Sequence, residues 1–312
     1  MIYQHPLAYL LGLEGIALLR AYGGEHDRAF TLARLAEIRT LLDRAAELGD
    51  GATAHPISTT EGYRAWAASY DSPGNQLLDL EQPVVRAILD RLPVGAALDA
   101  ACGTGRHSAH LSDLGHQVIG VDSSPEMLAL ARTKVPAADF REGTLERLPL
   151  PDDHVDLVIC ALALTHVTYL GSALAELARV LRPGGHLVLS DSRGILEDLG
   201  VPMVTTASDG SQVYLPNRLR RTSDYLAAAL PLGLEVRSCQ ELERPSPLVG
   251  PDGTPTADEN PVPPYDPGEP GDIWSLHRFA PAATNAAYHR MPVAIVWHFQ
   301  LATTEPGGGS RS

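Results

Sequence analysis

Two glycines lie between an apolar run and a helical pattern, at a spacing that suits a ligand-binding turn. The segment is LDAACGTGR, residues 98–106, and its glycines are Gly103 and Gly105. Glycine lets the backbone approach a ligand closely. The free N–H groups and the dipole at the start of the following helix favour a carboxylate or phosphate there. The pattern therefore predicts a binding turn at the carboxyl end of a strand.

An acidic residue at the end of the next apolar run extends this pattern. Asp122 closes QVIGVD and stands 17 residues beyond Gly105. In a doubly wound sheet such a carboxylate emerges beside the glycine turn, where it can accept hydrogen bonds from both hydroxyls of a ribose. A Gly-x-Gly pair alone is weak evidence. The ordered set of strand, glycine turn, helix, strand and acid predicts a ligand that contains adenosine.

Two residues around the turn bear on which adenosine compound binds. The dinucleotide fingerprint has a third glycine where this chain has Ser108. Asp99 precedes the turn, where an acid would sit poorly beside a pyrophosphate but would suit the ammonium group of a methionine moiety. A nicotinamide-dependent oxidoreductase is therefore the weaker alternative.

After residue 93, the elements that must position these residues follow one regular order. Continuous apolar strands alternate with helical patterns, which is typical of a parallel sheet covered on both faces. A short strand near 139–141 and a final hairpin from 234–243 and 293–302 complete the set. We expect an α/β fold with a doubly wound, seven-stranded mixed sheet. The other expected strands are 96–101, 117–122, 156–164 and 186–191, and the expected helices are 106–114, 125–134, 172–181 and 277–288.

The chain on either side of this core is organised differently. Apolar residues recur at helical spacing over 6–20 and 27–48, so residues 1–55 are predicted to be a helical hairpin that acts as a cap or a dimerisation element. Residues 56–302 are predicted to form the ligand-binding domain. Within it, residues 244–272 are rich in proline and acid, and are either a disordered insertion or an ordered lid. The tail 303–312 is expected to be disordered.

At these motifs the chain resembles class I S-adenosylmethionine-dependent methyltransferases, in the small-molecule branch similar to the ubiquinone and menaquinone biosynthesis enzymes. The segment VIGVDSSPEML looks like the second motif of that family. The segment LARVLRPGGHLVLSD matches its helix–turn–strand block, with residues 183–185 as the turn. The likeness runs from about residue 63 to 191 and loosely on to 301. It implies a Rossmann-like methyltransferase fold and S-adenosyl-L-methionine as the cofactor.

The resemblance also implies a set of cofactor-binding residues. Two departures concern it: the family usually has glycine where Ala101 stands, and aspartate where Thr144 stands. The contact with the adenine amino group would then fall to a backbone group or to Glu146. The full set is Tyr63, Tyr70, Asp99, Ala101, Gly103, Gly105, Asp122, Ser123, Met127, Thr144, Leu145 and Ala161.

A general base is needed only if the methyl acceptor carries a proton that must leave. His166 is the best candidate because it follows the fourth strand, where the sheet opens toward substrate; a structural strand cap is the alternative. Four C-terminal residues could line an acceptor pocket, although each alone is more simply a packed or surface residue. They are Arg218, His277, His289 and His298. No group of His, Asp and Cys has metal-site spacing, so we expect no metal.

Composition limits the partners. The formal net charge of −14 disfavours nucleic acid and anionic membranes, and three widely separated cysteines suggest reduced thiols in a cytoplasmic protein. We therefore predict an enzyme that methylates an O, N or C atom of a small molecule, as in secondary metabolism. A cofactor-binding protein without methyl transfer stays open as an alternative. A homodimer through the N-terminal helices is compatible with either.

Overall fold

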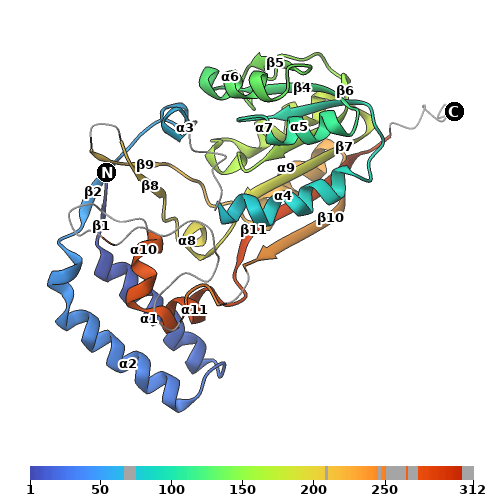
Figure 1. Cartoon of the computed structure of the whole chain (residues 1–312). Helices are drawn as coiled ribbons and strands as arrows, with labels where there is room; N and C mark the ends of the chain where they lie inside the picture. Colours follow the sequence, from blue (N-terminus) through green and yellow to red (C-terminus); the bar gives the residue numbers. More distant parts are fainter. Residues whose placement is uncertain (67–74, 208–209, 245–246, 251–264, 266–272, 304–312) are drawn as a thin grey trace. The chain divides into compact units, whose positions relative to one another are not determined.

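The computed structural model describes residues 1–66, 75–207, 210–244, 247–250, 265 and 273–303 (Figure 1). The chain divides into two compact units. Unit 1 comprises Met1–Ser58, Pro202–Pro216 and Glu243–Pro292, and unit 2 comprises Thr59–Val201, Asn217–Leu242 and Val293–Ser312. Three expectations fall largely or wholly outside the described residues: the contact by Tyr70, the state of the insertion 244–272, and the state of the tail.

Unit 2 is built on the predicted seven-stranded mixed sheet, in the order β10-β11-β7-β6-β3-β4-β5. Its neighbours from β7 to β5 pair in parallel, whereas β11 pairs with β7 in the antiparallel direction. The strand order reverses between β3 and β6, and such a switch point opens a crevice at the carboxyl ends of the strands. The strands are β3 (Ala96–Ala100), β4 (Gln117–Asp122), β5 (Asp139–Glu142), β6 (Val155–Ala161), β7 (Leu181–Ser192), β10 (Leu234–Glu243) and β11 (Pro292–Leu301).

Helices cover both faces of this sheet, which explains why its strands are continuously apolar. Leu98 on β3 packs in one buried cluster with Leu174 and Leu177 of α7. Its neighbour Ala97 packs in another with Val85 and Leu89 of α4. The described helices of unit 2 are α3 (Thr59–Trp66), α4 (Gln76–Leu89), α5 (Arg106–Asp113), α6 (Pro125–Lys134), α7 (Leu170–Val180), α8 (Ile195–Asp198) and α9 (Thr222–Ala229), with 3-10 turns at Leu164–His166 and Leu230–Leu232.

Two local expectations need correction. Residues 183–185, expected as a turn, fall within the range of β7, whose pairing with β6 is irregular between Val155 and Leu157. The helix expected over 277–288 is broken into α10 (Ile273–Leu276), a 3-10 turn (His277–Phe279) and α11 (Pro281–Tyr288). Pro281 has no N–H for the preceding helix and stands at the start of a new one.

Unit 1 contains the two predicted N-terminal helices, α1 (Pro6–Tyr22) and α2 (Arg28–Asp43), which pack side by side. α1 also packs against α11, and Leu10, Leu13 and Ala283 are among the buried residues of their shared core. A four-stranded sheet belongs to the same unit, in the order β1 (Ile2–Gln4), β2 (Ala52–Pro56), β9 (Gln212–Leu215) and β8 (Met203–Thr206). A 3-10 turn, Ala45–Leu48, follows α2. Across the described part of the chain, no helix has the length and apolar character needed to cross a bilayer.

Candidate cofactor and acceptor site

The glycine turn after β3 is held in the left-handed backbone region. Ala101, Gly103 and Gly105 have φ values of 56°, 53° and 81°. A Cβ added to Gly103 would meet no atom within 4 Å, whereas one added to Gly105 would lie 3.1 Å from the Cβ of Ala131. Gly103 therefore leaves open space beside the turn, and Gly105 allows the turn to pack closely on α6.

Asp122, the last residue of β4, is tied to the glycine turn. Its Oδ2 accepts a hydrogen bond from the Gly103 N–H, and its Oδ1 accepts one from the Ser124 N–H, each at 2.8 Å. Burial raises the pKa of the Asp122 carboxyl, and the two N–H groups act in the opposite direction. Each carboxylate oxygen keeps capacity for a further donor. The carboxylate is thus fixed in place and still able to accept ligand hydroxyls.

Asp122 and the turn line a pocket of about 940 Å³, including its open mouth. Most of the predicted site residues line it: Tyr63, Ala101, Gly103, Asp122, Ser123, Met127, Thr144, Leu145, Ala161 and His166. The other described lining residues are Thr59, Thr60, Val121, Ser124, Gly143, Glu146, Leu162, Ala163 and Val167.

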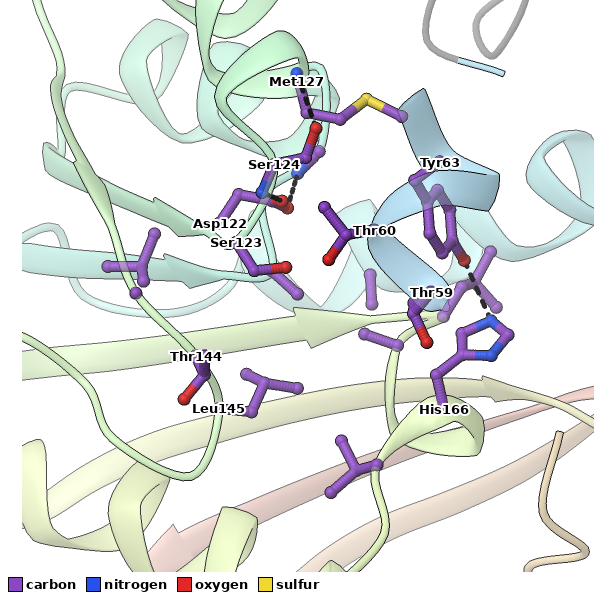
Figure 2. A pocket seen from close by; sticks show the side chains of 18 of the residues that line it. Thr59, Thr60, Tyr63, Asp122, Ser123, Ser124, Met127, Thr144, Leu145 and His166 are labelled. Carbon is purple, nitrogen blue, oxygen red and sulfur yellow. Dashed lines mark hydrogen bonds between the residues drawn. The ribbon is translucent and has the colours of Figure 1, made fainter. Parts of the chain in front are cut away.

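The pocket wall opposite the α6 start comes from the loop after β5. The Gly143 N–H donates to the Asp122 carbonyl oxygen at 3.0 Å, and a Cβ on Gly143 would come within 2.8 Å of Pro149 Cδ. Only glycine fits this close approach, which brings Thr144 and Leu145 to the pocket. Figure 2 shows Thr144 and Leu145 on one wall, with Asp122, Ser124 and Met127 above them.

Asp99 and Gly105, both predicted to contact cofactor, are not among the pocket-lining residues. The Asp99 side chain is 2% exposed and accepts a 2.6 Å hydrogen bond from Ser108 Oγ on α5. Burial raises the pKa of Asp99. In this structure Asp99 secures the start of α5 from within the core.

A second buried carboxylate, Glu81 on α4, supports the same helix and was not predicted. It accepts hydrogen bonds from Arg106 at 2.7 Å and from Ser190 Oγ at 2.6 Å. Burial alone would raise the pKa of Glu81, but His107 and Arg106 outweigh it and lower the pKa to about 2. The only signal in the sequence is an acid at an apolar position of a helical pattern, which does not identify its partners.

His166 and Tyr63 meet at the opposite side of the pocket from Asp122. The Tyr63 hydroxyl lies 3.1 Å from His166 Nε2, and the two rings pack edge to face at 5.6 Å (Figure 2). His166 ends the 3-10 turn after β6, and Tyr63 comes from α3. Thr59 and Thr60 also line the pocket; they precede Tyr63 by four and three residues, a spacing that places all three on one helix face.

The other predicted acceptor-side residues have partners elsewhere and do not line this pocket. His277 is buried in unit 1, where its Nε2 lies 2.7 Å from the Tyr9 hydroxyl, and burial lowers its pKa to about 3. His289 lies at the exposed end of α11 in the same unit. His298 pairs with His186 at 3.0 Å on the sheet of unit 2. Arg218 donates to Thr168 Oγ1 at 3.3 Å.

The residues of the pocket fit an adenosine compound. Asp122 offers acceptors for ribose hydroxyls, Gly103 leaves open space at the turn, and Met127 and Leu145 provide apolar surface for a flat ring. Among the residues lining the pocket that the structure describes, none is Lys or Arg that could pair with a pyrophosphate.

Comparisons with known proteins agree with this geometry. Residues 98–189 match a family model described as "Methyltransferase domain". The malonyl-[acyl-carrier protein] O-methyltransferase of Yersinia pestis is 40% identical over 136 residues, which is 43% of this chain and 50% of that protein. The demethylmenaquinone methyltransferase of Beutenbergia cavernae is 37% identical over 129 residues, which is 40% of this chain and 54% of that protein. The chain thus matches about half the length of these relatives.

A solved structure shares the fold over a longer stretch. The DhpI-SAH complex superposes with a TM-score of 0.53 and 22% identity, covering 80% of this chain and 99% of that one. The likeness supports the fold, and the stretch that matches the family model, residues 98–189, contains the glycine turn and Asp122. The stretch 98–189 of the chain is therefore a methyltransferase domain of the class I, S-adenosylmethionine-dependent kind.

Proposed function

We propose that this chain transfers a methyl group from S-adenosylmethionine to an O, N or C atom of a small-molecule acceptor. One observation carries the proposal. Asp122 is fixed by two 2.8 Å hydrogen bonds to Gly103 and Ser124, beside a turn that leaves open space for a ligand. Such a carboxylate suits a ribose, and it lies within the stretch that matches the methyltransferase domain model.

The cofactor-side residues have distinct proposed roles. Asp122 accepts the ribose hydroxyls, Gly103 and Ala101 bring the backbone to the methionine side, and Met127 and Leu145 pack on the adenine. Thr144 stands where aspartate is usual, so the adenine amino group falls to a backbone group or to Glu146. When bound, the cofactor supplies a sulfonium methyl group as the electrophile.

The acceptor-side residues must align the acceptor and exclude water. Tyr63, Thr59 and Thr60 line that side of the pocket from α3, and His166 faces Tyr63. His166 is the proposed base for an acceptor that must lose a proton. Its hydrogen bond with Tyr63 limits the rotation of the imidazole ring.

The test is transfer of the tritium-labelled methyl group of S-[methyl-³H]adenosylmethionine to a panel of acceptors. The panel contains phenols, amines, carboxylic acids and activated carbon acids. We expect labelled product from one class, and we expect excess S-adenosylhomocysteine to suppress it. Cofactor binding with no labelled product from any class would contradict methyl transfer. It would favour the alternative of a cofactor-binding protein.

We also propose a setting for this activity. The acidic net charge supports an enzyme that acts on small molecules and binds neither nucleic acid nor an anionic membrane surface, and the three widely separated cysteines support a cytoplasmic location. Residues 1–55 are proposed as a cap or as the contact of a homodimer. In support of the second role, Leu32, Leu35 and Leu42 are exposed along α2, although that helix packs on α1.

A further inference from the structure

Unit 1 contains a pocket of its own, which shares no described lining residue with the cofactor pocket. Its volume is about 1280 Å³, including its open mouth. The end of α1, the turn to α2 and the first turn of α2 contribute Arg20, Glu25, His26 and Phe30. Residues between 282 and 290 contribute from α11 and its end. The proposed methyl transfer makes no use of this pocket.

Hydrogen bonds fix the part of the pocket wall beside α11. The Asn285 side chain accepts from the Leu248 and Val249 N–H groups at 2.8 and 3.0 Å, and it donates to the Val249 carbonyl oxygen at 2.7 Å. Leu248 and Val249 are both buried. These bonds hold the backbone of this segment against α11, and both Pro247 and Asn285 line the pocket. This wall is therefore built from packed backbone.

Arg20 presents a positive charge in a fixed orientation. Its guanidinium donates to Glu25 Oε2 at 2.7 Å and to the His289 carbonyl oxygen at 2.6 Å. The two bonds use two of the five N–H donors of the group, and the side chain is 16% exposed. Arg20 is thus oriented before a ligand arrives and keeps donors that suit an anion.

Arg290 supplies a second cation, and it directly follows the residue whose carbonyl oxygen Arg20 binds. Among the residues that the structure describes, its side chain has no hydrogen-bond or ion-pair partner. Its backbone has a φ of 54°, in the left-handed region where glycine or asparagine usually ends a helix. Residues held in this region cluster at ligand-binding and other functional sites. Arg290 therefore combines an unusual backbone position with a charge that is open to a ligand.

Positive charge exceeds negative charge in this pocket, although the net charge of the whole chain is −14. Glu25 is the only acid among the described lining residues, against Arg20 and Arg290. The pKa of Glu25 is lowered, chiefly by the hydrogen bond from Arg20, and His289 and His26 act in the same direction. The carboxylate of Glu25 thus already lies among positive groups. The charges favour an anion as the ligand of this pocket.

Apolar groups lie beside these charges. The rings of His26 and Phe30 stack with their centroids 3.9 Å apart. Ala282 and Ala286 line the pocket from α11. A bare inorganic anion would leave this apolar surface uncovered, whereas an organic anion would bury it and gain from its removal from water.

We propose that this pocket binds a small organic anion, whose carboxylate or phosphate group contacts Arg20 and Arg290 and whose apolar part packs on Phe30 and the two alanines. Charge-assisted hydrogen bonds from guanidinium groups are strong for either anionic group. The proposal concerns a site in unit 1, so it does not depend on the proposed methyl transfer.

The first experiment titrates the whole chain by calorimetry with benzoate, phenyl phosphate and benzyl alcohol. The first two probes carry the two anionic groups, and the third is their neutral counterpart. We expect the better of the two anions to bind at least tenfold more tightly than benzyl alcohol, and that anion identifies the preferred group. Binding of neither anion overturns the proposal, and so does equally tight binding of benzyl alcohol.

Variants of the cations assign that binding to this pocket. Arg290→Asn removes the charge, and asparagine is tolerated in the left-handed region, so we expect a folded protein with at least tenfold weaker anion binding. Arg39→Gln is the matched control, because Arg39 is exposed on α2 and does not line the pocket. Unchanged affinity in Arg290→Asn, or an equal loss in Arg39→Gln, overturns the assignment.

Two variants of Ala282 test recognition by charge while both arginines stay in place. Ala282 is exposed and lies in the first turn of α11, where an acidic side chain suits the helix. We expect Ala282→Glu to weaken anion binding at least tenfold, because it adds a carboxylate to the pocket. Ala282→Gln has nearly the same size and is expected to bind the anion almost as the wild type does. Equal affinity in the two variants overturns the proposal.

Discussion

At the scale of single residues, the site depends on backbone positions as much as on side chains. Gly103 gives the turn its open space, and the Gly103 N–H also helps to fix Asp122. Gly105, two residues later, has a packing role instead, because its lack of a side chain allows close contact with Ala131. Two glycines of one motif thus serve binding and packing separately.

Replacing each glycine by alanine separates the binding role of Gly103 from the packing role of Gly105. Both substitutions place a Cβ in the left-handed region, which costs about 1–2 kcal/mol. We expect Gly103→Ala to weaken binding of S-adenosylhomocysteine at least tenfold, because its Cβ enters ligand space. We expect Gly105→Ala to lose more thermal stability and less affinity, because its Cβ presses on Ala131. Calorimetry and thermal unfolding of both variants check this, and wild-type affinity in Gly103→Ala would refute it.

The buried carboxyl of Asp191 predicts a pH dependence of stability. Burial raises its pKa to about 6, against the partly opposing hydrogen bonds from Tyr225 and the backbone. The folded state therefore holds a proton that the unfolded state has lost between about pH 4 and pH 6. Folding stability from this group is full below that window and falls as pH rises through it, by about 3 kcal/mol in all.

Asp191→Asn isolates that contribution. The variant cannot ionise, yet its amide oxygen can still accept a hydrogen bond from Tyr225. We expect the free energy of unfolding, measured with urea at several pH values, to fall less steeply between pH 4 and pH 6 in the variant than in the wild type. Parallel pH profiles would show that Asp191 does not titrate in this window.

The sequence could predict the residues of the site whose positions follow from chain order. Gly103 lies in the turn after β3 and Asp122 ends the neighbouring parallel strand β4, so their meeting at one sheet edge was expected. The placement of Asp99 was not, because alternate residues of a strand face opposite sides and spacing alone does not say which face meets the ligand. Glu81 acts through partners on α5 and β7, which only the folded chain brings together.

At the scale of elements, the periodicity of apolar residues predicted the strands and helices of the core. The expected and observed elements differ where single residues interrupt that periodicity. Ser124 and Pro125 start α6 as a typical cap and first residue, where a helix was expected. Pro281 interrupts the stretch expected as one helix. These differences follow from single residues that override a longer apolar pattern.

The α1–α2 pair offers a test at this scale through a buried ion pair. Glu14 and Arg34 lie 2.9 Å apart with little exposure, and burial raises the pKa of Glu14 to about 7 despite Arg34. Glu14→Ala leaves the arginine charge buried without its partner, which we expect to destabilise unit 1 by about 3–5 kcal/mol.

The double variant Glu14→Leu with Arg34→Met is the control, because it removes both charges and keeps apolar volume. We expect it to recover most of the lost stability. Urea unfolding of both proteins measures the difference. A loss below about 1 kcal/mol in Glu14→Ala would show that the ion pair contributes little to holding the helices.

At the scale of the whole molecule, the chain makes two units from interleaved segments. Unit 1 draws on residues 1–58, 202–216 and 243–292, so the predicted N-terminal hairpin shares its unit with segments far along the sequence. Local patterns predict elements, but they carry no information on which distant segments pack together. The sequence therefore could not predict which segments form unit 1, although it predicted most of the helices in that unit.

Self-association is the prediction that belongs to this scale. Leu32, Leu35 and Leu42 on α2 are 48%, 41% and 52% exposed and lie at spacings of three and seven residues, as in helices that pair. We expect a homodimer in sedimentation velocity, and we expect Leu35→Glu to dissociate it. Leu130→Glu on α6, where the leucine is 40% exposed, is the control. A monomer at every protein concentration would contradict the proposed dimer.

The central claim is that the pocket anchored by Asp122 binds S-adenosylmethionine. The most direct test is calorimetric titration of the whole chain with S-adenosylmethionine, S-adenosylhomocysteine and NADH, repeated with Asp122→Asn. We predict affinities on the order of micromolar for both adenosyl compounds, no binding of NADH, and at least tenfold weaker binding in the variant. Absence of binding by both adenosyl compounds, or equal affinity in wild type and Asp122→Asn, would contradict the claim.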